Sequence, residues 1–385
     1  MFRKFTADQI FTGLEMLPGQ HVLICNRDGE IADLVSMADA GDDIESFQGT
    51  LSPGFVNAHC HIELSHLKGK IPERQGLVNF VQQVMALREA DAETKLASMI
   101  QAEQELFTGG TVAIGDICNT TDSIALKMNS PLQWHNFIEV SGFVEAGAEK
   151  RFNAAGEIRQ QFIQQLSTMP ATLSPHAPYS VSEKLFSLLN EHTAGQLISI
   201  HNQESPAEND LYEKKSGDFL RLYENMGIDI TAFSATGQTS LKSWLPNINK
   251  NQTILSVHNT HTSIADVEFI ETVTGKEVKD YFFCICINAN LYIENSLPPL
   301  EMLMNKGCKM VIGTDSYASN WQLNVMEELK AIRKHFPAIP WEQLLRWATI
   351  NGAMALGLGD RLGSFDRGKK PGILLLSDDK ASRLL

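Results

Sequence analysis

The central part of the chain alternates short β-branched and aromatic runs with longer segments of helical periodicity. The short runs predict strands at Gly54–His59, Thr111–Ile117, Trp134–Val140, Ala171–Ser174, Leu197–His201, Thr253–His258, Phe282–Ile287 and Met310–Thr314. Apolar residues three and four positions apart predict helices at Leu77–Glu89, Ala92–Phe107, Asn324–Phe336 and Trp341–Leu356. Alternating strands and helices are typical of parallel α/β folds. Eight such strands over about 300 residues favour a closed (β/α)8 TIM barrel over an open sheet.

The two ends of the chain carry a different pattern. Residues His21–Val35 contain two short apolar runs separated by a tight turn with a glycine, and Gly363–Leu376 contains further short apolar pieces. Neither end is long enough to bury a core of its own. We therefore expect residues 1–50 and 357–385 to pair into one small β-domain, beside a barrel formed by residues 51–356.

Composition and charge narrow the choice of partner. The chain has 385 residues, of which 43% are hydrophobic and 20% charged, which is ordinary for a globular protein. Its 32 basic and 46 acidic side chains give a net charge of −14. Phosphate backbones and anionic lipid surfaces would repel such a chain. We therefore expect a small-molecule substrate, and neither nucleic acid nor membrane as a partner.

The cysteines and the hydropathy pattern indicate the compartment. None of the six cysteines forms a Cys-x-x-Cys pair, and most lie in apolar runs, where cysteine acts as a small buried hydrophobe. The amino terminus lacks the apolar segment of a secretion signal, and no apolar stretch approaches the roughly 20 residues of a membrane-spanning helix. These features predict a cytoplasmic protein.

The strongest chemical signal is the pair His59 and His61, at the end of the first predicted barrel strand. In a strand, residues i and i+2 project to the same face, so both imidazoles can reach one ion. Zinc accepts such ligands at about 2.0–2.1 Å. The carboxyl end of a barrel strand is also where barrel enzymes carry their active sites. We interpret the pair as metal ligands.

Further polar residues follow the ends of other predicted strands. His176 follows the fourth strand, His201 ends the fifth with Glu204 just beyond it, His258 ends the sixth, and Asp315 follows the eighth. Each is a weak signal alone, because a lone histidine is often a hydrogen-bonded structural group. Together they predict three imidazoles and a carboxylate at one barrel mouth, with another histidine and a glutamate beside them.

These motifs resemble the amidohydrolase superfamily, in its cytosine-deaminase and chlorohydrolase-like branch. The resemblance rests on Pro53–His61, His201-x-x-Glu204, Val257-His258 and Gly313-Thr314-Asp315, and it covers nearly the whole chain. It implies a small β-sandwich domain built from both chain ends. It also implies one divalent metal, with zinc as the first choice and iron or manganese as alternatives. The ligands that it implies are His59, His61, His201 and Asp315.

The resemblance also implies a mechanism. The cation lowers the pKa of a bound water toward about 7, and Asp315 accepts the proton released. His258 steadies the attacking oxygen, while Glu204 donates a proton to a ring nitrogen. The expected reaction is hydrolytic deamination of an aminated purine-type base or nucleoside, with release of ammonia. No lysine occurs from Ala171 to Ser182 to bridge a second metal, so we expect a single ion.

The predicted substrate contacts are His176, Glu63 and Asn290. The segment around His176 resembles the one that contacts the sugar side of the substrate in nucleoside-deaminating relatives. Glu63-Leu64-Ser65 and the residues around Phe80 resemble the aminodeoxyfutalosine deaminase group. Two alternatives stay open: His176 as a structural hydrogen-bonding group, and Glu63 as a carboxylate in the first turn of a helix. Ala289 departs from the serine that often precedes the position of Asn290 in relatives.

Other functions are compatible with the same motifs. The metal site could instead remove chlorine from a ring or open a cyclic amide. A protein of another class would be a catalytically silent amidohydrolase-like scaffold, but such a protein would be expected to lack metal ligands. Residues 206–250 are long enough to place a helix and a loop over the site, with Trp244, Phe233 and Tyr212 as a hydrophobic wall. A homodimer is expected from base rates.

Overall fold

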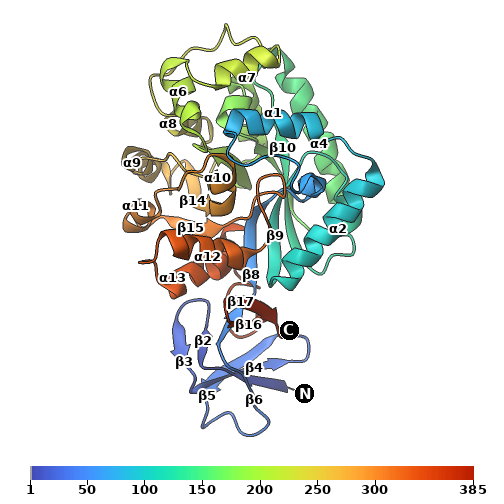
Figure 1. The fold of residues 1–385 in the computed structure, drawn as a ribbon, viewed down its shortest axis with the longest axis vertical. Coiled ribbons are helices and arrows are strands. Elements are labelled where there is room, and N and C mark those ends of the chain that lie inside the picture. The colour runs from blue at the N-terminus through green and yellow to red at the C-terminus, as the bar shows by residue number, and fades with distance from the viewer. Residues whose placement is uncertain (1) are drawn as a thin grey trace.

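The computed structural model describes residues 2–385. Figure 1 shows two parts: a larger barrel with helices around its strands and, below it, a smaller part made of strands in which both chain ends lie. Parallel strands joined by helices form the larger part, as the sequence pattern predicts. The arrangement is mixed α/β.

The barrel contains two four-stranded parallel sheets, with the orders β11-β10-β9-β8 and β12-β13-β14-β15. Its strands are β8 (Phe55–Cys60), β9 (Thr111–Cys118), β10 (Gln133–Val140), β11 (Ala171–Pro175), β12 (Leu197–Asn202), β13 (Gln252–His258), β14 (Val278–Ile285) and β15 (Lys309–Ile312). All eight overlap the predicted strands. The seventh predicted strand extends too far, because β14 ends at Ile285 and Ile287 already begins a helix.

Backbone hydrogen bonds close the two sheets into a ring. The N–H groups of Thr314 and Asp315 both donate to the carbonyl of His59 at 3.1 Å, which joins the end of β15 to β8. On the other side, the His201 N–H donates to the His176 carbonyl at 2.9 Å, which joins β12 to the end of β11. The predicted (β/α)8 barrel is confirmed.

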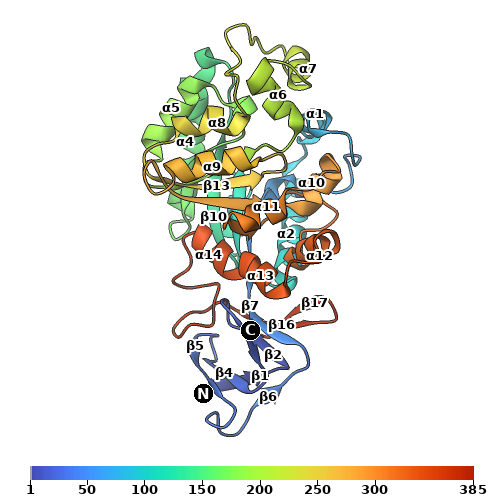
Figure 2. The same ribbon diagram turned by 90° about the vertical axis from the view of Figure 1, so that its left-hand side faces the viewer.

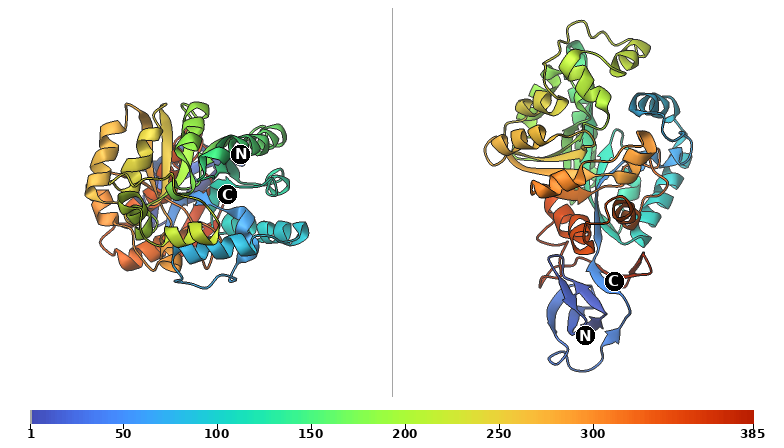
Figure 3. Two further views of the ribbon diagram at one scale, coloured as in Figure 1. Left: turned by 90° about the horizontal axis from the view of Figure 1, so that it is seen from above. Right: turned by 60° about the vertical axis from the view of Figure 1, so that its left-hand side comes forward.

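Helices surround the strands, as the views in Figures 2 and 3 show. They are α1 (Leu77–Leu87), α2 (Ala92–Thr108), α3 (Ile124–Lys127), α4 (Ala148–Gln165), α5 (Glu183–His192), α6 (Pro206–Lys214), α7 (Phe219–Asn225), α8 (Ser240–Trp244), α9 (Ile264–Val273), α10 (Ile287–Ile293), α11 (Leu300–Asn305), α12 (Val325–His335), α13 (Trp341–Arg346) and α14 (Gly352–Ala355). Helix α2 begins where the Asp91 side chain accepts from the Thr94 N–H at 2.8 Å. It ends just before Gly110, whose φ of 91° suits glycine.

The predicted helix Trp341–Leu356 is interrupted. Between α13 and α14, residues Trp347–Asn351 form a π-helical turn. Just beyond this turn, Gly352 lies against β8, because a Cβ added to it would come within 2.8 Å of the Val56 side chain. The missing side chain lets the helix approach the strand closely, and apolar periodicity alone does not reveal the extra residue of a π turn.

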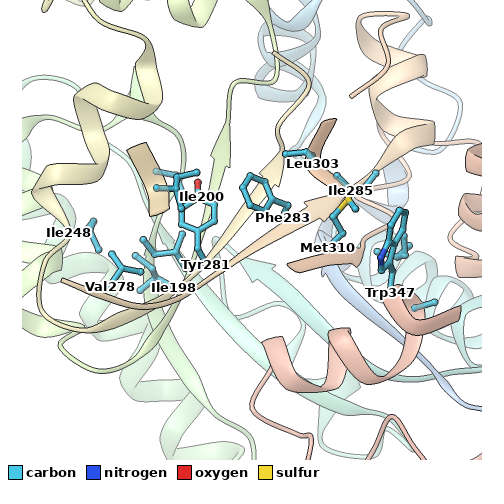
Figure 4. Close-up of a cluster of buried hydrophobic side chains, with 14 of the residues drawn as sticks. Ile198, Ile200, Ile248, Val278, Tyr281, Phe283, Ile285, Leu303, Met310 and Trp347 are labelled. Atoms are coloured by element: carbon cyan, nitrogen blue, oxygen red, sulfur yellow. The ribbon is translucent and has the colours of Figure 1, made fainter. Parts of the chain in front are cut away.

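The main hydrophobic core lies between the strands and the surrounding helices (Figure 4). In β12, Ile198 and Ile200 are fully buried in this core, as are Phe283 and Ile285 of β14. Because side chains alternate across a strand, His201 takes the face opposite to Ile200. The same alternation that builds the core therefore directs this histidine toward the barrel interior.

The small domain consists of two sheets, with the orders β5-β4-β1-β6 and β17-β16-β7-β2-β3. Its strands are β1 (Phe2–Thr6), β2 (Gln9–Phe11), β3 (Met16–Pro18), β4 (His21–Asn26), β5 (Ile31–Ser36), β6 (Glu45–Ser46), β7 (Thr50–Pro53), β16 (Ile373–Ser377) and β17 (Lys380–Arg383). Residues from both chain ends share one core, including Phe5, Leu23, Phe365 and Ile373. Strand β7 crosses the predicted boundary at residue 50 and pairs antiparallel with β16.

Within residues 2–385, no helix has both the length and the apolar composition needed to cross a bilayer.

Candidate active site

Three histidines from the ends of two strands converge at the carboxyl end of the barrel. The Nε2 atom of His61 lies 3.2 Å from Nε2 of His59 and 3.2 Å from Nε2 of His201. An Asp315 oxygen, Oδ1, lies 3.4 Å from Nε2 of His61 and 3.6 Å from Nε2 of His59. The structure thus brings together the four side chains that the sequence suggests as ligands, although they are up to 256 positions apart (59 to 315).

The protonation of these rings suits a cation. Burial lowers the pKa of His59 and His201, and it lowers the pKa of His61 to about 3. The neutral ring of His201 has its proton on Nδ1, since this atom donates to the His176 carbonyl at 2.7 Å. Its Nε2 lone pair therefore points to the other imidazoles.

Asp315 is held in place by several contacts. Its backbone has a φ of 57°, a conformation that non-glycine residues seldom adopt and that clusters at functional sites. The Ser319 hydroxyl donates to Oδ2 at 2.6 Å, which leaves Oδ1 to face the imidazoles. Next to it, the Thr314 N–H donates to the Asn57 side chain at 3.0 Å. Burial acts to raise the pKa of Asp315, but the His59 side chain and the nearby imidazoles lower it below its ordinary value.

Glu204 and His258 form a pair beside this cluster. Oε1 of Glu204 lies 3.6 Å from Nε2 of His258, and both side chains are buried. Burial raises the pKa of Glu204 well above its ordinary value, and the negative charge of Asp315 raises it further. Nδ1 of His258 donates to Oδ1 of Asn290 at 2.8 Å, which orients the ring. Asn290, which the sequence suggested as a substrate contact, is thus a hydrogen-bond partner of His258.

The other two predicted substrate contacts differ in position. His176 lines the cavity beside the cluster of His59, His61, His201 and Asp315. Its Nδ1 forms a hydrogen bond with the Ser180 hydroxyl at 2.7 Å, and that hydroxyl also lies 3.0 Å from the Ala177 carbonyl oxygen. Glu63 is buried outside the cavity lining, and its carboxylate accepts from the N–H groups of Asn119 and Thr120 at 2.8 and 3.2 Å. The structure does not bring Glu63 into the cavity.

A cavity of about 340 Å³ leads from His61, His201 and Asp315 to the surface. This volume lies within the usual range for sites that bind small molecules. The wall contains polar residues such as Arg88 and Arg151, and most of its apolar part comes from α1 and α7. Figure 2 shows these two helices at the end of the barrel away from the small domain. The wall residues on these helices are Leu77, Phe80, Val81, Val84, Met85, Leu222 and Tyr223.

Residues 206–250 fold into α6, α7 and α8, and α7 lies over the cavity. The expected wall of Trp244, Phe233 and Tyr212 is not what faces it. Trp244 is buried in the main core and donates to the Asn202 side chain at 2.8 Å. Tyr212 donates to the Pro178 carbonyl at 2.8 Å. Trp244 and Tyr212 therefore pack behind the cavity wall, because buried aromatic residues with a polar group find hydrogen-bond partners in the core.

Two groups near the site were not predicted from the sequence. Glu139 lines the cavity, and its position near the end of β10 was the available signal. The second group is a fully buried ion pair, with Nζ of Lys127 2.5 Å from Oδ2 of Asp116. Oδ1 of Asp116 accepts from the Ile62 N–H at 2.8 Å, directly after His61. Nothing in the sequence pattern indicates that this lysine turns inward.

The donor set fits a single zinc-type cation. Nitrogen atoms bound at about 2.0–2.1 Å in a tetrahedral site lie about 3.3 Å apart, close to the 3.2 Å between the Nε2 atoms. The ligand nitrogens of His59, His61 and His201 also all lie within 4.8 Å of one another. Three neutral imidazoles and a carboxylate are ligands that divalent zinc accepts.

A barrel with such a histidine cluster at its mouth defines a class of metal-dependent hydrolases. Residues 50–383 match the model of the Amidohydrolase family, and the chain belongs to this family. The family is metal-dependent. Membership accounts for the alternation of strands and helices and for the histidines at strand ends.

Several named deaminases are similar to this chain. The aminodeoxyfutalosine deaminase of a Nitratiruptor species is 28% identical over 324 residues, which cover 80% of this chain and 74% of that protein. The 5-methylthioadenosine/S-adenosylhomocysteine deaminase of Thermococcus onnurineus is 27% identical over 90% of this chain and 78% of its own length.

Solved structures share the fold. The structure of Helicobacter pylori aminofutalosine deaminase in complex with methylthio-coformycin has a TM-score of 0.82 and 21% identity, and the match covers 97% of this chain and 92% of that one. The zinc complex of atrazine chlorohydrolase from Arthrobacter aurescens TC1 has a TM-score of 0.74 and 15% identity, over 96% and 86% of the two chains. At these identities the likeness concerns the fold.

Proposed function

We propose that this protein is a hydrolytic deaminase that releases ammonia from the purine ring of adenosine-like nucleosides. The observation that carries the proposal is the convergence of His59, His61, His201 and Asp315 next to the buried pair Glu204 and His258. The deaminase names of the relatives at 27% and 28% identity support the same reaction. The cavity is large enough for a small molecule and ends at these groups.

In this proposal the four ligands hold one divalent cation, and zinc suits the histidine-rich set. When bound, the ion supplies a Lewis acid that lowers the pKa of water toward about 7. Asp315 takes the proton released from that water, with its other oxygen held by Ser319. His258, oriented by Asn290, hydrogen-bonds to the attacking oxygen.

Glu204 is the proton donor to the purine ring. A buried carboxyl with a raised pKa holds its proton at neutral pH and can transfer it to a ring nitrogen. Protonation of the ring makes the neighbouring carbon a better electrophile, and the water oxygen bonds to that carbon. Asp315 then passes its proton to the amino group, and the C–NH2 bond breaks to release ammonia while the hydroxyl proton returns to Glu204 and leaves C=O on the ring. The apolar walls from α1 and α7 would enclose the part of the nucleoside that extends away from the cation.

The test is a screen for ammonia release by the metal-loaded protein. Substrates are adenosine, 5'-deoxyadenosine, 5-methylthioadenosine, S-adenosylhomocysteine and aminodeoxyfutalosine, with adenine, guanine and cytosine as free bases. The proposal expects turnover of at least one nucleoside with kcat/KM above that of every free base. Release of chloride from a chlorinated ring without any release of ammonia would replace it with the dechlorinase alternative. A metal-loaded protein that hydrolyses none of these compounds would favour the scaffold.

Compartment and assembly complete the proposal. All six cysteines are unpaired in residues 2–385, which supports a reducing compartment such as the cytoplasm. The homodimer stays a prediction, which light scattering on the purified protein tests. The metal is assigned by elemental analysis of protein purified without added metal, with zinc as the expected element.

A further inference from the structure

Glu139 is a carboxylate in the cavity for which the proposed chemistry has no use. It extends from β10 and lines the cavity together with Glu204 and Asp315, the other two carboxylates among the described lining residues. Its Oε2 atom is buried and has no hydrogen-bond partner in residues 2–385. A buried acceptor without a partner is costly, so it calls for a donor that arrives with the ligand.

His176 lies beside it. The ligand atoms of Glu139, His176 and His201 all lie within 4.8 Å of one another. Nδ1 of His176 lies 2.7 Å from the Ser180 hydroxyl. A carboxylate and an imidazole therefore share one end of the cavity, next to His201 and the other expected metal ligands.

The space between Glu139 and His176 is poorly suited to a second cation. Both nitrogens of His201 are already committed, since Nε2 faces His61 at 3.2 Å and Nδ1 donates to the His176 carbonyl at 2.7 Å. Only Glu139 and His176 would remain as protein ligands, and zinc sites normally have three or four. A hydrogen-bond donor on the substrate fits the unpartnered Oε2 atom of Glu139 better.

We infer that Glu139 binds a sugar hydroxyl of the nucleoside and sets the preference for ribonucleosides. This inference rests on the proposed function. The adenine ring of a nucleoside carries only its amino group as a donor, and that group must lie at the cation with Asp315 and His258. The remaining donors are the hydroxyls of the sugar. Glu63, which the sequence suggested as a substrate contact, is occupied by Asn119 and Thr120.

The experiment compares kcat/KM for adenosine, 2'-deoxyadenosine and 3'-deoxyadenosine in four proteins: wild type, Glu139→Ala, Glu139→Gln and Glu145→Gln. Glu145 is an exposed carboxylate just beyond β10, so its variant controls for the loss of one charge. In the wild type and the control, adenosine should be preferred over at least one deoxynucleoside by about tenfold or more, as expected for a hydrogen bond to a charged group.

In Glu139→Ala the rate for adenosine should fall to that for this deoxynucleoside, while the rate for the deoxynucleoside and the metal content stay unchanged. Glu139→Gln keeps an acceptor oxygen and should retain part of the preference. An equal loss on all three nucleosides would overturn the inference. Two metal ions per wild-type chain, with one lost in Glu139→Ala, would also overturn it.

Failure of the proposed function gives a separate result. A wild-type protein that releases no ammonia from any nucleoside overturns the deaminase proposal. Calorimetric titration with inosine and 2',3'-dideoxyinosine then still decides the role of Glu139. If Glu139→Ala binds inosine more weakly than the wild type but binds 2',3'-dideoxyinosine equally well, the sugar contact is supported. Equal binding of inosine by the wild type and the variant contradicts it.

Discussion

The buried pair Lys127 and Asp116 allows a quantitative test of how the site is supported. Both side chains are inaccessible to solvent, and Nζ of Lys127 also donates to Oδ1 of Asn136 at 2.7 Å. Burial acts to lower the pKa of Lys127, but the charge of Asp116 raises it above its ordinary value, so the lysine is charged. Lys127→Met removes this charge with little change in side-chain length and leaves Asp116 buried without its cation.

Removal of one partner of a buried ion pair costs about 3–5 kcal/mol, because the remaining charge has lost its compensation. The free energy of unfolding should fall by this amount in Lys127→Met. Replacement of both partners, in Lys127→Met with Asp116→Asn, should cost less than the single change. The control is Lys184→Met, which breaks a 2.7 Å pair with Glu149 whose side chains are 46% and 69% exposed. Such exposed pairs contribute about 0–1 kcal/mol.

Urea unfolding followed by tryptophan fluorescence measures these differences. The five tryptophans all fall within residues 51–356, so the signal reports the barrel. Because Asp116 also accepts from the Ile62 N–H beside His61, Lys127→Met should bind zinc more weakly than the wild type. Equal unfolding midpoints for Lys127→Met and Lys184→Met would refute the reasoning, as would a double variant less stable than Lys127→Met.

Three further substitutions test other parts of the account. Glu204→Gln should keep its metal but lose turnover by about 100-fold or more, and full ammonia release by this variant would remove Glu204 from the mechanism. Asn290→Ala frees the His258 ring and should lower kcat/KM about tenfold at unchanged metal content. Asn290→Asp should restore part of the rate. Equal rates for the wild type and both variants would contradict the orienting role of Asn290. Burial raises the pKa of Glu208 to about 8 from 4.5, so the folded protein holds this proton where the unfolded chain has released it. The stabilisation is full below pH 4.5 and is lost as the pH rises to 8. Across this range the free energy of unfolding of the wild type should therefore fall by on the order of 4 kcal/mol more than that of Glu208→Gln. Parallel pH profiles of the two proteins in urea unfolding would exclude this contribution of Glu208.

The barrel and its metal-ligand candidates could be predicted because both follow from local periodicity. A strand directs alternate residues to one face, so His59 and His61 share a face, and Ile200 in the core places His201 on the interior side. The rule that barrel enzymes carry their sites at the carboxyl ends of strands then brings in Asp315. Each step uses neighbouring residues and one general property of the fold.

The rest of the site depends on contacts between distant segments. Glu63 reads as a cavity residue from its nearness to His61, but it turns to the backbone of Asn119 and Thr120. Lys127 looks like an ordinary helix-end lysine, yet it points into the barrel wall to meet Asp116. The cavity walls come from whole helices whose packing over the barrel mouth no short sequence pattern specifies.

The central claim is that four side chains hold one divalent cation that nucleoside deamination requires. The most direct measurement is a metal titration of chelated protein, in which bound zinc and ammonia release from the preferred nucleoside are recorded together. The account predicts that activity is absent without metal, rises in proportion to bound zinc and reaches its maximum at one ion per chain. Full activity in metal-free protein would contradict it, as would a protein with one bound zinc that releases no ammonia.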